Sequence, residues 1–405
     1  MPLSTVVSDR HSLVRQFLEQ RFPLIDATKQ GALMAGDWKR LLGIAGVERD
    51  AAHDSAVPGA QRRVIGTALD YRLRYYFSVT PSDELVAARG ARLLRRRGAP
   101  ARARPVASLV QPFLSSLDEF LTSRSPVGRA LSDSDEERLA RYCVVLAHLE
   151  AFFRAGTDIE SPLYSLVKGS TLEDLLAVPP EHQVRDLCAL SRECFEDGRE
   201  LFGLPCVLNP AFDGSADIGG ADADLVVGQC LLEVKTVSSA HAGTVREAVY
   251  QLLGYTLLDY SDRYGIRQIG VWLTRQRCIW VLPLAQALTA PAALLHSGAL
   301  ADSVVDQRLS ELRDELADVL KRPRAWGANG RLSFRMLAMP EAVRISRSIG
   351  GTVEELMAEA ERRARQRATH ELFVDEMIQD ILWEIEAERG QKSTDRSTSC
   401  APPSG

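Results

Sequence analysis

The clearest pattern of hydrophobic positions along the chain is a pair of short apolar runs separated by a two-residue turn. The runs cover residues 225–227 and 230–234, interrupted once by Glu233, and the turn is Gly228-Gln229. Short apolar runs around a turn that begins with glycine are typical of a tight β-hairpin. We therefore predict a hairpin here, and the interpretation of the rest of the chain depends on it.

Counting residue pairs outward from the turn predicts which polar side chains meet. With Val227 opposite the first residue after the turn, Asp224 lies opposite Glu233. Two positions farther from the turn, Asp222 lies opposite Lys235. Residues two apart on a strand share a face, and directly opposed Cβ atoms are about 5 Å apart. The pattern therefore predicts three acids and a lysine on one side of the hairpin, at its open end.

Two carboxylates at the end of an apolar hairpin need a positive charge between them. Like charges opposite one another destabilise a sheet, and a half-buried carboxylate loses hydration. Mg²⁺ fits this position because it prefers carboxylate and water oxygens and completes its shell with substrate phosphate, and Mn²⁺ accepts the same ligands. We predict Asp224 and Glu233 as metal ligands, with Asp222 in reserve. Lys235 would lie beside the metal, where its ammonium could orient or help to deprotonate a bound water.

Asp224, the hairpin and Glu233-Val234-Lys235 together resemble the PD-(D/E)xK nuclease superfamily, whose fold is shared by many restriction enzymes and RecB-like exonucleases. The helical pattern after the hairpin carries Gln251 and Tyr255 four apart and hence on one face. This spacing is similar to the Q-x-x-x-Y signature of the RecB-like members. The first motif departs from the family pattern, because residues 220–224 read Gly-Ala-Asp-Ala-Asp and lack the proline.

The elements around the hairpin follow the order of the superfamily core, which is helix, strands, helix, strands. Residues 181–202 predict a helix ended by Gly203, and residues 267–274 and 277–282 predict two further strands. The resemblance extends over residues 181–284, about a quarter of the chain. It implies an α/β fold with a restriction-endonuclease-like core, a mixed central sheet flanked by helices, and helical N-terminal and C-terminal extensions.

The resemblance also implies roles for residues outside the hairpin. Gln251 and Tyr255 would orient the catalytic strand or touch the substrate. The helix before the hairpin could add Glu193 as a further acidic ligand, as some superfamily members do. RecB-like proteins often hold a helix with a glycine followed by polar residues near the active site, and residues 66–74 are a candidate for it.

Helical patterns fill the chain on both sides of this core. We predict a mainly helical N-terminal region over residues 1–180, the nuclease-like core over 181–290, a helical C-terminal region over 291–390 and a disordered polar tail over 391–405. The apolar stripe of residues 352–388 could pack on the body of the protein or on a second copy in a homodimer. We favour packing within the chain, because heptads are not sustained.

Arginine supplies most of the basic residues, and two stretches are candidate nucleic-acid contacts. The first contains Arg72 and Arg74 on a periodic apolar pattern, for which a packing helix with surface arginines is an equal alternative. The second, residues 89–104, holds seven arginines and no acid. Three of these arginines are consecutive: Arg95, Arg96 and Arg97. Such a run could contact phosphates in a salt-sensitive manner, whereas its Gly, Ala and Pro content also fits a solvated linker.

Composition narrows the class of protein. A chain of 405 residues, 45% hydrophobic and 25% charged, can bury a sizeable core. The net charge of -5 excludes a globally basic nucleic-acid binder, so contacts must come from local patches. Seven cysteines without a C-x-x-C pair are typical of reduced core thiols. No run is long enough to span a membrane, and Asp9 and Arg10 interrupt the place of a signal sequence. We therefore expect a cytoplasmic protein.

These observations predict a nuclease that hydrolyses phosphodiester bonds of nucleic acid, with DNA the expected substrate and Mg²⁺ or Mn²⁺ the cofactor. Two alternatives stay open. The same fold could serve as a catalytically silent nucleic-acid-binding or scaffold protein of a defence or repair system, which would bind DNA without metal or cleavage. The acids and the lysine could instead form a structural ion-pair cluster in a helical interaction protein, which would bind no divalent metal.

Overall fold

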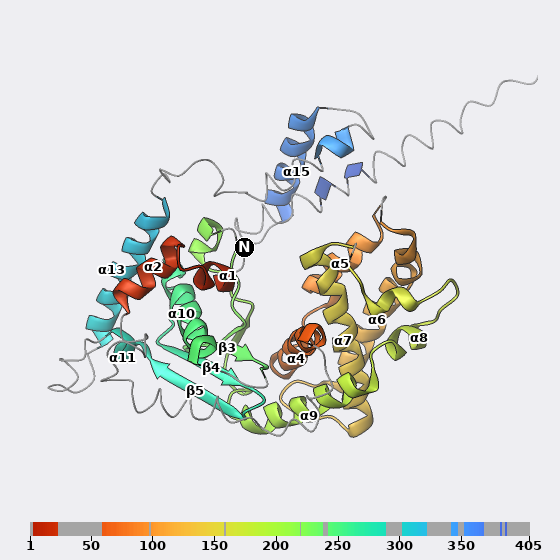
Figure 1. Cartoon of the computed structure of the whole chain (residues 1–405), viewed down its shortest axis with the longest axis horizontal. Coiled ribbons are helices and arrows are strands. Elements are labelled where there is room, and N and C mark those ends of the chain that lie inside the picture. Colours follow the sequence, from red (N-terminus) through yellow and green to blue (C-terminus); the bar gives the residue numbers. More distant parts are fainter. Residues whose placement is uncertain are drawn as a thin grey trace, which may run out of the picture.

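The predicted hairpin lies in a five-stranded mixed sheet of the computed structural model (Figure 1). The strands are neighbours in chain order: β1 (Cys206–Leu208), β2 (Leu225–Val227), β3 (Cys230–Lys235), β4 (Gln268–Leu273) and β5 (Cys278–Pro283). Adjacent strands are antiparallel except β3 and β4, which are parallel. The structure describes residues 3–22, 59–96, 99–157, 159–218, 220–237, 242–288, 302–321, 342–346, 352–367, 381–382 and 385–386.

The register of the hairpin is the one that the turn predicts. Leu225 pairs with Leu232, and Val227 pairs with Cys230. Gly228 has a φ of +58°, the left-handed conformation that a two-residue hairpin turn requires. The two further strands predicted after the hairpin are present as β4 and β5. The hairpin and the strand predictions are therefore confirmed.

Helix α10 (Ala242–Leu258) joins the parallel strands β3 and β4, which need a crossover connection. Its apolar side chains share one hydrophobic cluster with a face of the sheet and with four other helices. These are α1 (Leu3–Ser8), α2 (Leu13–Arg21), α11 (Leu284–Leu288) and α13 (Asp302–Lys321). We call this group, with the sheet, the sheet lobe. The domain prediction had assigned α1, α2 and α13 to the flanking regions, and the structure groups them with the sheet instead.

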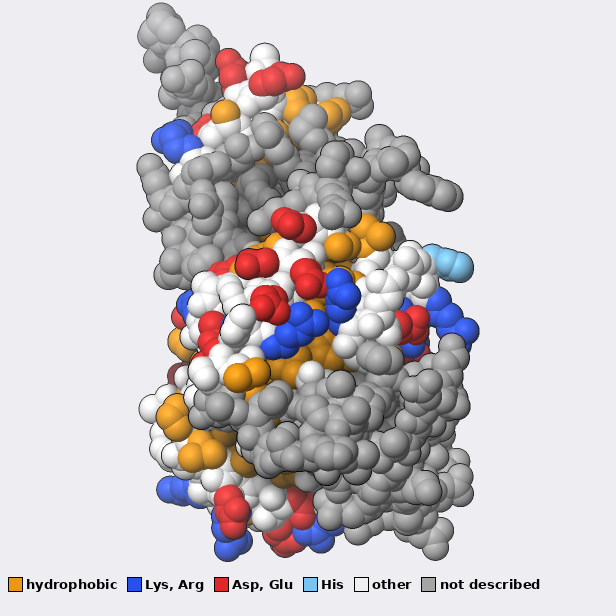
Figure 2. All heavy atoms as spheres, turned by 90° about the vertical axis from the view of Figure 1, so that its left-hand side faces the viewer, with side chains coloured by type: hydrophobic (Ala, Val, Ile, Leu, Met, Phe, Trp, Pro, Cys, Tyr) orange, Lys and Arg blue, Asp and Glu red, His pale blue; other side chains and the backbone are white. Residues whose placement is uncertain are grey.

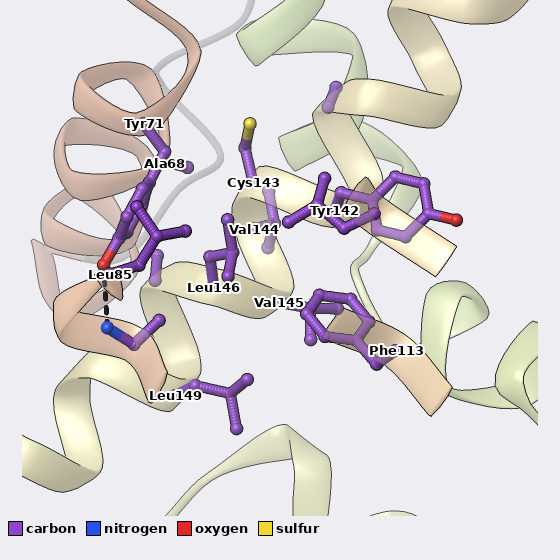
Figure 3. Packing of buried hydrophobic residues seen from close by; sticks show 14 of the residues in the cluster. Ala68, Tyr71, Leu85, Phe113, Tyr142, Cys143, Val144, Val145, Leu146 and Leu149 are labelled. Carbon is purple, nitrogen blue, oxygen red and sulfur yellow. Dashed lines mark hydrogen bonds between the residues drawn. The ribbon is translucent and has the colours of Figure 1, made fainter. Parts of the chain in front are cut away.

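A second group of helices forms the helical lobe, whose core is shown in Figure 3. Its members are α4 (Gly59–Phe77), α5 (Val86–Leu94), α6 (Arg104–Arg124), α7 (Asp133–Ala155), α8 (Leu172–Ala177) and α9 (Glu181–Asp197). The Oη of Tyr71 on α4 accepts a hydrogen bond of 3.1 Å from the backbone N–H of Ala87 on α5. A Cβ on Gly90 would lie 1.8 Å from the carbonyl oxygen of Leu149, so glycine is what lets α5 pack so closely on α7.

The helical lobe covers the second face of the sheet. Trp272 of β4 is fully buried in the same hydrophobic cluster as the helices of this lobe, and Val234 and Ile279 pack against that cluster. Two arginines of the β4–β5 turn form ion pairs with α9: Arg275 with Asp186 at 2.7 Å and Arg277 with Asp197 at 2.8 Å. The protein is therefore a mixed α/β structure in which helices flank the sheet on both faces.

Short 3₁₀ helices and a separate C-terminal group complete the described structure. The 3₁₀ helices are η2 (Ser82–Glu84), η3 (Ala101–Ala103), η4 (Pro162–Ser165) and η5 (Asp213–Ile218). Helix α15 (Val353–Arg367) begins at the predicted capping box, because the backbone N–H of Glu355 donates to the Thr352 hydroxyl. Described apolar residues of the C-terminal region, including Leu356 and Ile385, pack together in a cluster of their own. The predicted tail, residues 391–405, lies outside the described residues.

The surface of α13 is acidic. Its exposed acids are Asp306, Glu311, Asp314 and Asp318. Figure 2 faces this side of the molecule and shows acidic side chains gathered on it, with a few basic ones among them. Among the described residues, no helix is both long enough and apolar enough to cross a membrane. The charge of the α13 side would repel a polyanion.

Candidate carboxylate and lysine site

The open end of the hairpin brings Asp224, Glu233 and Lys235 together. Glu233 and Lys235 pair in register with Val271 and Leu273 of β4, whose side chains pack beneath α10. Side chains paired across parallel strands share a face. The glutamate and the lysine therefore emerge on one side of the sheet, as the pairing count predicts, and that side is the one covered by α10. Lys235 Nζ donates to Glu233 Oε1 at 2.5 Å.

The two carboxylates differ in exposure, because Glu233 is buried and Asp224 is half-buried. Glu233 is only 4% exposed, and its Oε2 is buried without a hydrogen-bond partner in the described part of the chain. Asp224 Oδ2 accepts a hydrogen bond of 2.7 Å from the backbone N–H of Val234. A buried oxygen with no hydrogen-bond donor destabilises the fold. A cation bound at Glu233 Oε2 would remove this cost.

Burial governs the charge state of the site. Desolvation raises the pKa of Asp224 well above its usual value, the negative charges of Glu233 and Asp70 raise it further, and Lys235 and the Val234 N–H oppose the shift. Burial lowers the pKa of Lys235, but the carboxylates of Glu233 and Asp224 outweigh this effect and leave it raised. Lys235 is therefore a protonated ammonium at neutral pH, whereas its surroundings disfavour the ionised form of Asp224.

Helix α10 supplies the predicted glutamine and tyrosine. Gln251 Nε2 donates to Tyr255 Oη at 3.2 Å, and Tyr255 Oη donates to the backbone carbonyl of Asp222 at 2.6 Å. The tyrosine ring stacks on Phe212 at a centroid distance of 5.3 Å. The pair therefore fixes the backbone two residues before Asp224, which is a positioning contact for the site.

The structure differs from the sequence prediction at Asp222. Strand β2 begins at Leu225, and Asp222 instead forms an isolated antiparallel bridge with Ala211. The lysine donates to Glu233, and its acidic neighbours are Glu233, Asp224 and Glu247. Asp222 is exposed, and its charge acts on Asp70 and Arg154 of the helical lobe. The strand pairing that would set Asp222 directly opposite Lys235 therefore ends before it reaches Asp222.

A residue that the sequence did not single out, Asp70 on α4, also acts on the site. Asp70 Oδ2 accepts from Arg74 at 2.5 Å, while its Oδ1 is buried without a partner among the described residues. Burial raises the pKa of Asp70, Arg74 opposes the shift, and the charges of Glu150 and Asp222 add to it. The glycine-plus-polar pattern of residues 66–74 pointed to this helix, but nothing local in it marked the aspartate.

The remaining predicted site residues lie elsewhere. Arg72 is fully buried and binds Glu136 with two hydrogen bonds of 2.8 Å, so the nucleic-acid contact predicted for it is wrong. Arg74 is largely buried against Asp70. Glu193 on α9 acts on Arg277, and its role as a metal ligand stays a prediction.

The Arg-rich run is mainly structured. It covers the second half of α5, the 3₁₀ helix η3 and the start of α6, which does not fit a solvated linker over those residues. Arg95 is exposed and Arg96 is half-buried just after α5, and Arg97 lies outside the described residues. Arg95 and Arg96 line a pocket between the end of α5 and the start of α6.

The oxygen ligands at the hairpin end suit some metal ions and not others. Among the described residues, no group of three or more His, Cys, Asp or Glu side chains could hold an ion. Two carboxylates, Asp224 and Glu233, remain at the hairpin end, and Glu233 Oε2 is unpaired in the described structure. Two oxygen ligands suit Mg²⁺, which keeps several waters and uses substrate phosphate, but do not suit a closed structural zinc site.

Comparisons of the chain with protein-family models, curated proteins and solved structures found no match. The class of protein is thus defined by the fold alone, a mixed α/β protein with a five-stranded sheet flanked by helices.

Proposed function

We propose that the protein is a metal-dependent nuclease that hydrolyses phosphodiester bonds of nucleic acid, with DNA as the expected substrate. The proposal rests on one observation: Asp224, Glu233 and Lys235 meet at the end of the β2–β3 hairpin, with one carboxylate oxygen left unpaired. The parallel β3–β4 pair joined by α10 adds support, because it agrees with the restriction-endonuclease-like core that the motif implies.

Asp224 and Glu233 would hold Mg²⁺ or Mn²⁺. Bound there, the ion would neutralise the carboxylates and act as a Lewis acid toward the scissile phosphate. Glu233 Oε2 is free to face the ion while its Oε1 keeps the hydrogen bond from Lys235. An added cation would also favour ionised Asp224, whose pKa burial raises.

Lys235 acts through its positive charge. An ammonium donates hydrogen bonds and cannot accept a proton, and the raised pKa of Lys235 keeps it in this form at neutral pH. We therefore assign it to orienting the attacking water and to offsetting negative charge on the phosphate, and not to removing the proton from water. Gln251 and Tyr255 are positioning residues, because they hold the backbone of Asp222.

The experiment is a cleavage assay with the purified full chain. Labelled single-stranded and duplex DNA and RNA are incubated with Mg²⁺, with Mn²⁺ or with EDTA. Cleavage is expected with metal, and Lys235→Ala should reduce it by at least about 100-fold. Lys168→Ala is the matched control, because Lys168 is an exposed lysine of the helical lobe. Equal cleavage by Lys235→Ala and the wild-type protein would reject the proposal.

A second candidate is a catalytically silent nucleic-acid-binding protein. One observation favours it: Lys235 already neutralises Glu233 without any metal. This candidate predicts that titration calorimetry detects no Mn²⁺ binding while the protein still binds DNA in EDTA. Binding of Mn²⁺ that disappears in Glu233→Gln would favour the nuclease.

A further inference from the structure

A pocket of about 600 Å³ lies between the end of α5 and the start of α6. Its apolar part is formed by Leu94 and two alanines. Its polar lining is basic or uncharged and contains no acid: Arg95, Arg96, Arg104, Ser108 and Gln111. Leu94, Arg95 and Arg96 come from the end of α5, and the other polar residues come from the start of α6. The pocket thus lies between two helices and is lined by positively charged side chains.

Two of these arginines are available to a ligand. In the part of the chain that the structure describes, Arg95 and Arg104 are exposed and have no acidic partner. Arg102, from the same run, contrasts with them: it forms an ion pair with Glu160 at 3.1 Å and lies over the ring of Tyr164. An unpaired guanidinium presents a planar fork of N–H donors that matches the oxygens of a phosphate.

The spacing along α6 aims its polar groups into the same opening. Arg104, Ser108 and Gln111 are separated by four and three residues, so they lie on one face of the helix. The Ser108 hydroxyl already donates to the carbonyl of Pro105 at 2.7 Å. The donors left for a ligand are therefore Arg95, Arg104 and the Gln111 amide. Helix α6 has no acid in its first turn, so nothing there cancels the partial positive charge of a helix start.

We propose that this pocket binds phosphate groups, as carried by a nucleic-acid backbone or by a free polyphosphate. The chain has a net charge of -5, and α13 presents an acidic surface on the opposite side of the molecule (Figures 1 and 2). An acid-free pocket on the helical lobe gives a polyanion a place to bind despite that background. The proposal does not depend on nuclease activity, because it uses none of the carboxylate-site residues.

The first test measures binding of a fluorescent single-stranded oligonucleotide of about 30 nucleotides by anisotropy, in EDTA, over a series of salt concentrations. Each phosphate contact contributes about 0.7 to the slope of log K against log salt for a single strand. Arg104→Gln should lower this slope by about 0.7, and Arg95→Gln/Arg104→Gln should lower it by about 1.4. The affinity should fall about tenfold for each arginine removed.

Arg129→Gln is the matched control. Arg129 is exposed and follows the far end of α6, about 30 Å from Arg104 for a helix of this length. The Arg129→Gln substitution removes the same charge outside the pocket, so it should change the slope of log K against log salt little. Thermal melting of each variant checks folding, and an unchanged melting temperature is expected because Arg95 and Arg104 are exposed.

The second test identifies the source of the phosphate. Titration calorimetry with sodium tripolyphosphate compares the wild-type protein with the double variant. Loss of oligonucleotide binding supports a nucleic-acid strand as the ligand, and loss of tripolyphosphate binding alone supports a free polyphosphate. If the double variant binds both probes as the wild-type protein does, or if Arg129→Gln weakens them equally, the pocket assignment is wrong. Cleavage has no part in either readout, so failure here leaves the nuclease proposal standing.

Discussion

The ionised form of Asp224 is unfavourable in the folded protein without a cation. Its folded-state pKa lies well above the ordinary value of 3.8, because of burial and of the nearby carboxylates. A group with a raised folded-state pKa stabilises the fold below its unfolded pKa and loses that contribution as the pH rises through the folded value. The residue that the proposed chemistry needs ionised is therefore one that weakens the metal-free protein at neutral pH.

We therefore predict that Asp224→Asn raises the melting temperature of the metal-free protein at pH 7, by roughly 2–4 °C. The amide keeps the shape and can still accept the hydrogen bond from Val234. The difference from wild type should shrink as the pH is lowered toward 4. Calorimetric scans in EDTA between pH 4 and 7 measure it, with the exposed Asp314→Asn as control. A difference that does not change with pH would contradict the burial argument.

A second prediction concerns divalent metal. Mn²⁺ at about 100 times its Kd should stabilise the wild-type protein by about 2.7 kcal/mol, and Glu233→Gln should abolish this gain because it removes one ligand. Glu193→Gln is the informative control: Glu193 lies toward Arg277, so this variant should keep the stabilisation. Thermal shift assays with MnCl₂ and with EDTA provide the measurement. An equal gain in Glu233→Gln would remove Glu233 from the metal site.

The site residues that could be predicted are those whose relative positions depend on local geometry. A two-residue turn fixes the register of its own hairpin, which is why Asp224 could be set opposite Glu233 from sequence. The position of Asp222 could not, because the pairing ends at Leu225. Asp70 reaches the site only through contacts between elements far apart in sequence. Arg72 could not be separated from Arg74 until its partner on α7, Glu136, was known.

At the scale of single elements, α5 depends on one close contact. Gly90→Ala would place a Cβ 1.8 Å from the backbone oxygen of Leu149, and backbone cannot move aside as a flexible side chain does. We expect Gly90→Ala to lower the free energy of unfolding by about 1–3 kcal/mol. Gly66→Ala on α4 is the control, because nothing lies within 4 Å of its Cβ, and it should stabilise the helix by roughly 0.5–1 kcal/mol. Urea unfolding of both variants gives the comparison.

The elements themselves were largely predictable. The hairpin, β4, β5 and α10 appear where their patterns predict them. Helix α9 ends earlier than predicted, at Asp197, where Gly198 lies against the side chain of Trp272. A Cβ at that position would lie 2.4 Å from the tryptophan ring. The helix thus ends at its C-cap residue Gly198 and not at the later Gly203, because periodicity along one segment does not choose between two nearby glycines.

At the scale of the whole molecule, two ion pairs between the β4–β5 turn and α9 make unequal contributions. Arg275 and Asp186 have side chains 11% and 3% exposed, whereas Arg277 and Asp197 are 31% and 16% exposed. Breaking a buried pair leaves an uncompensated charge and costs about 3–5 kcal/mol. A pair open to solvent contributes about 0–1 kcal/mol, and the Arg277–Asp197 pair lies closer to that limit than the Arg275–Asp186 pair does. Burial, and not the shared position in the turn, therefore decides how much each arginine stabilises the contact between the lobes.

We predict that Arg275→Gln lowers the free energy of unfolding by about 3–5 kcal/mol, while Arg277→Gln lowers it by about 1 kcal/mol or less. Urea titration followed by tryptophan fluorescence is suitable, because Trp272 is buried where the sheet meets the helices. Adding Asp186→Asn to Arg275→Gln should recover part of the loss. Equal losses in the two arginine variants would contradict this account.

The grouping of elements into lobes could not be predicted from the sequence. The division into residues 1–180, 181–290 and 291–390 followed changes of pattern along the chain. In the structure, α1 and α2 from the start of the chain and α13 from after the sheet all pack with α10. Each of these helices has an apolar face, but the sequence of one helix does not identify the distant element against which that face packs.

This grouping sets an order of assembly as the chain leaves the ribosome. The helices of the helical lobe follow one another without interruption from α4 to α9, so their mutual contacts can form while synthesis continues. The sheet lobe must wait, because α1 and α2 have no α10 to pack on, and α10 lacks α13, until residue 321 has emerged. The carboxylates at the hairpin end would therefore reach their final surroundings only after α13 has been translated, which keeps the proposed metal site unformed until then.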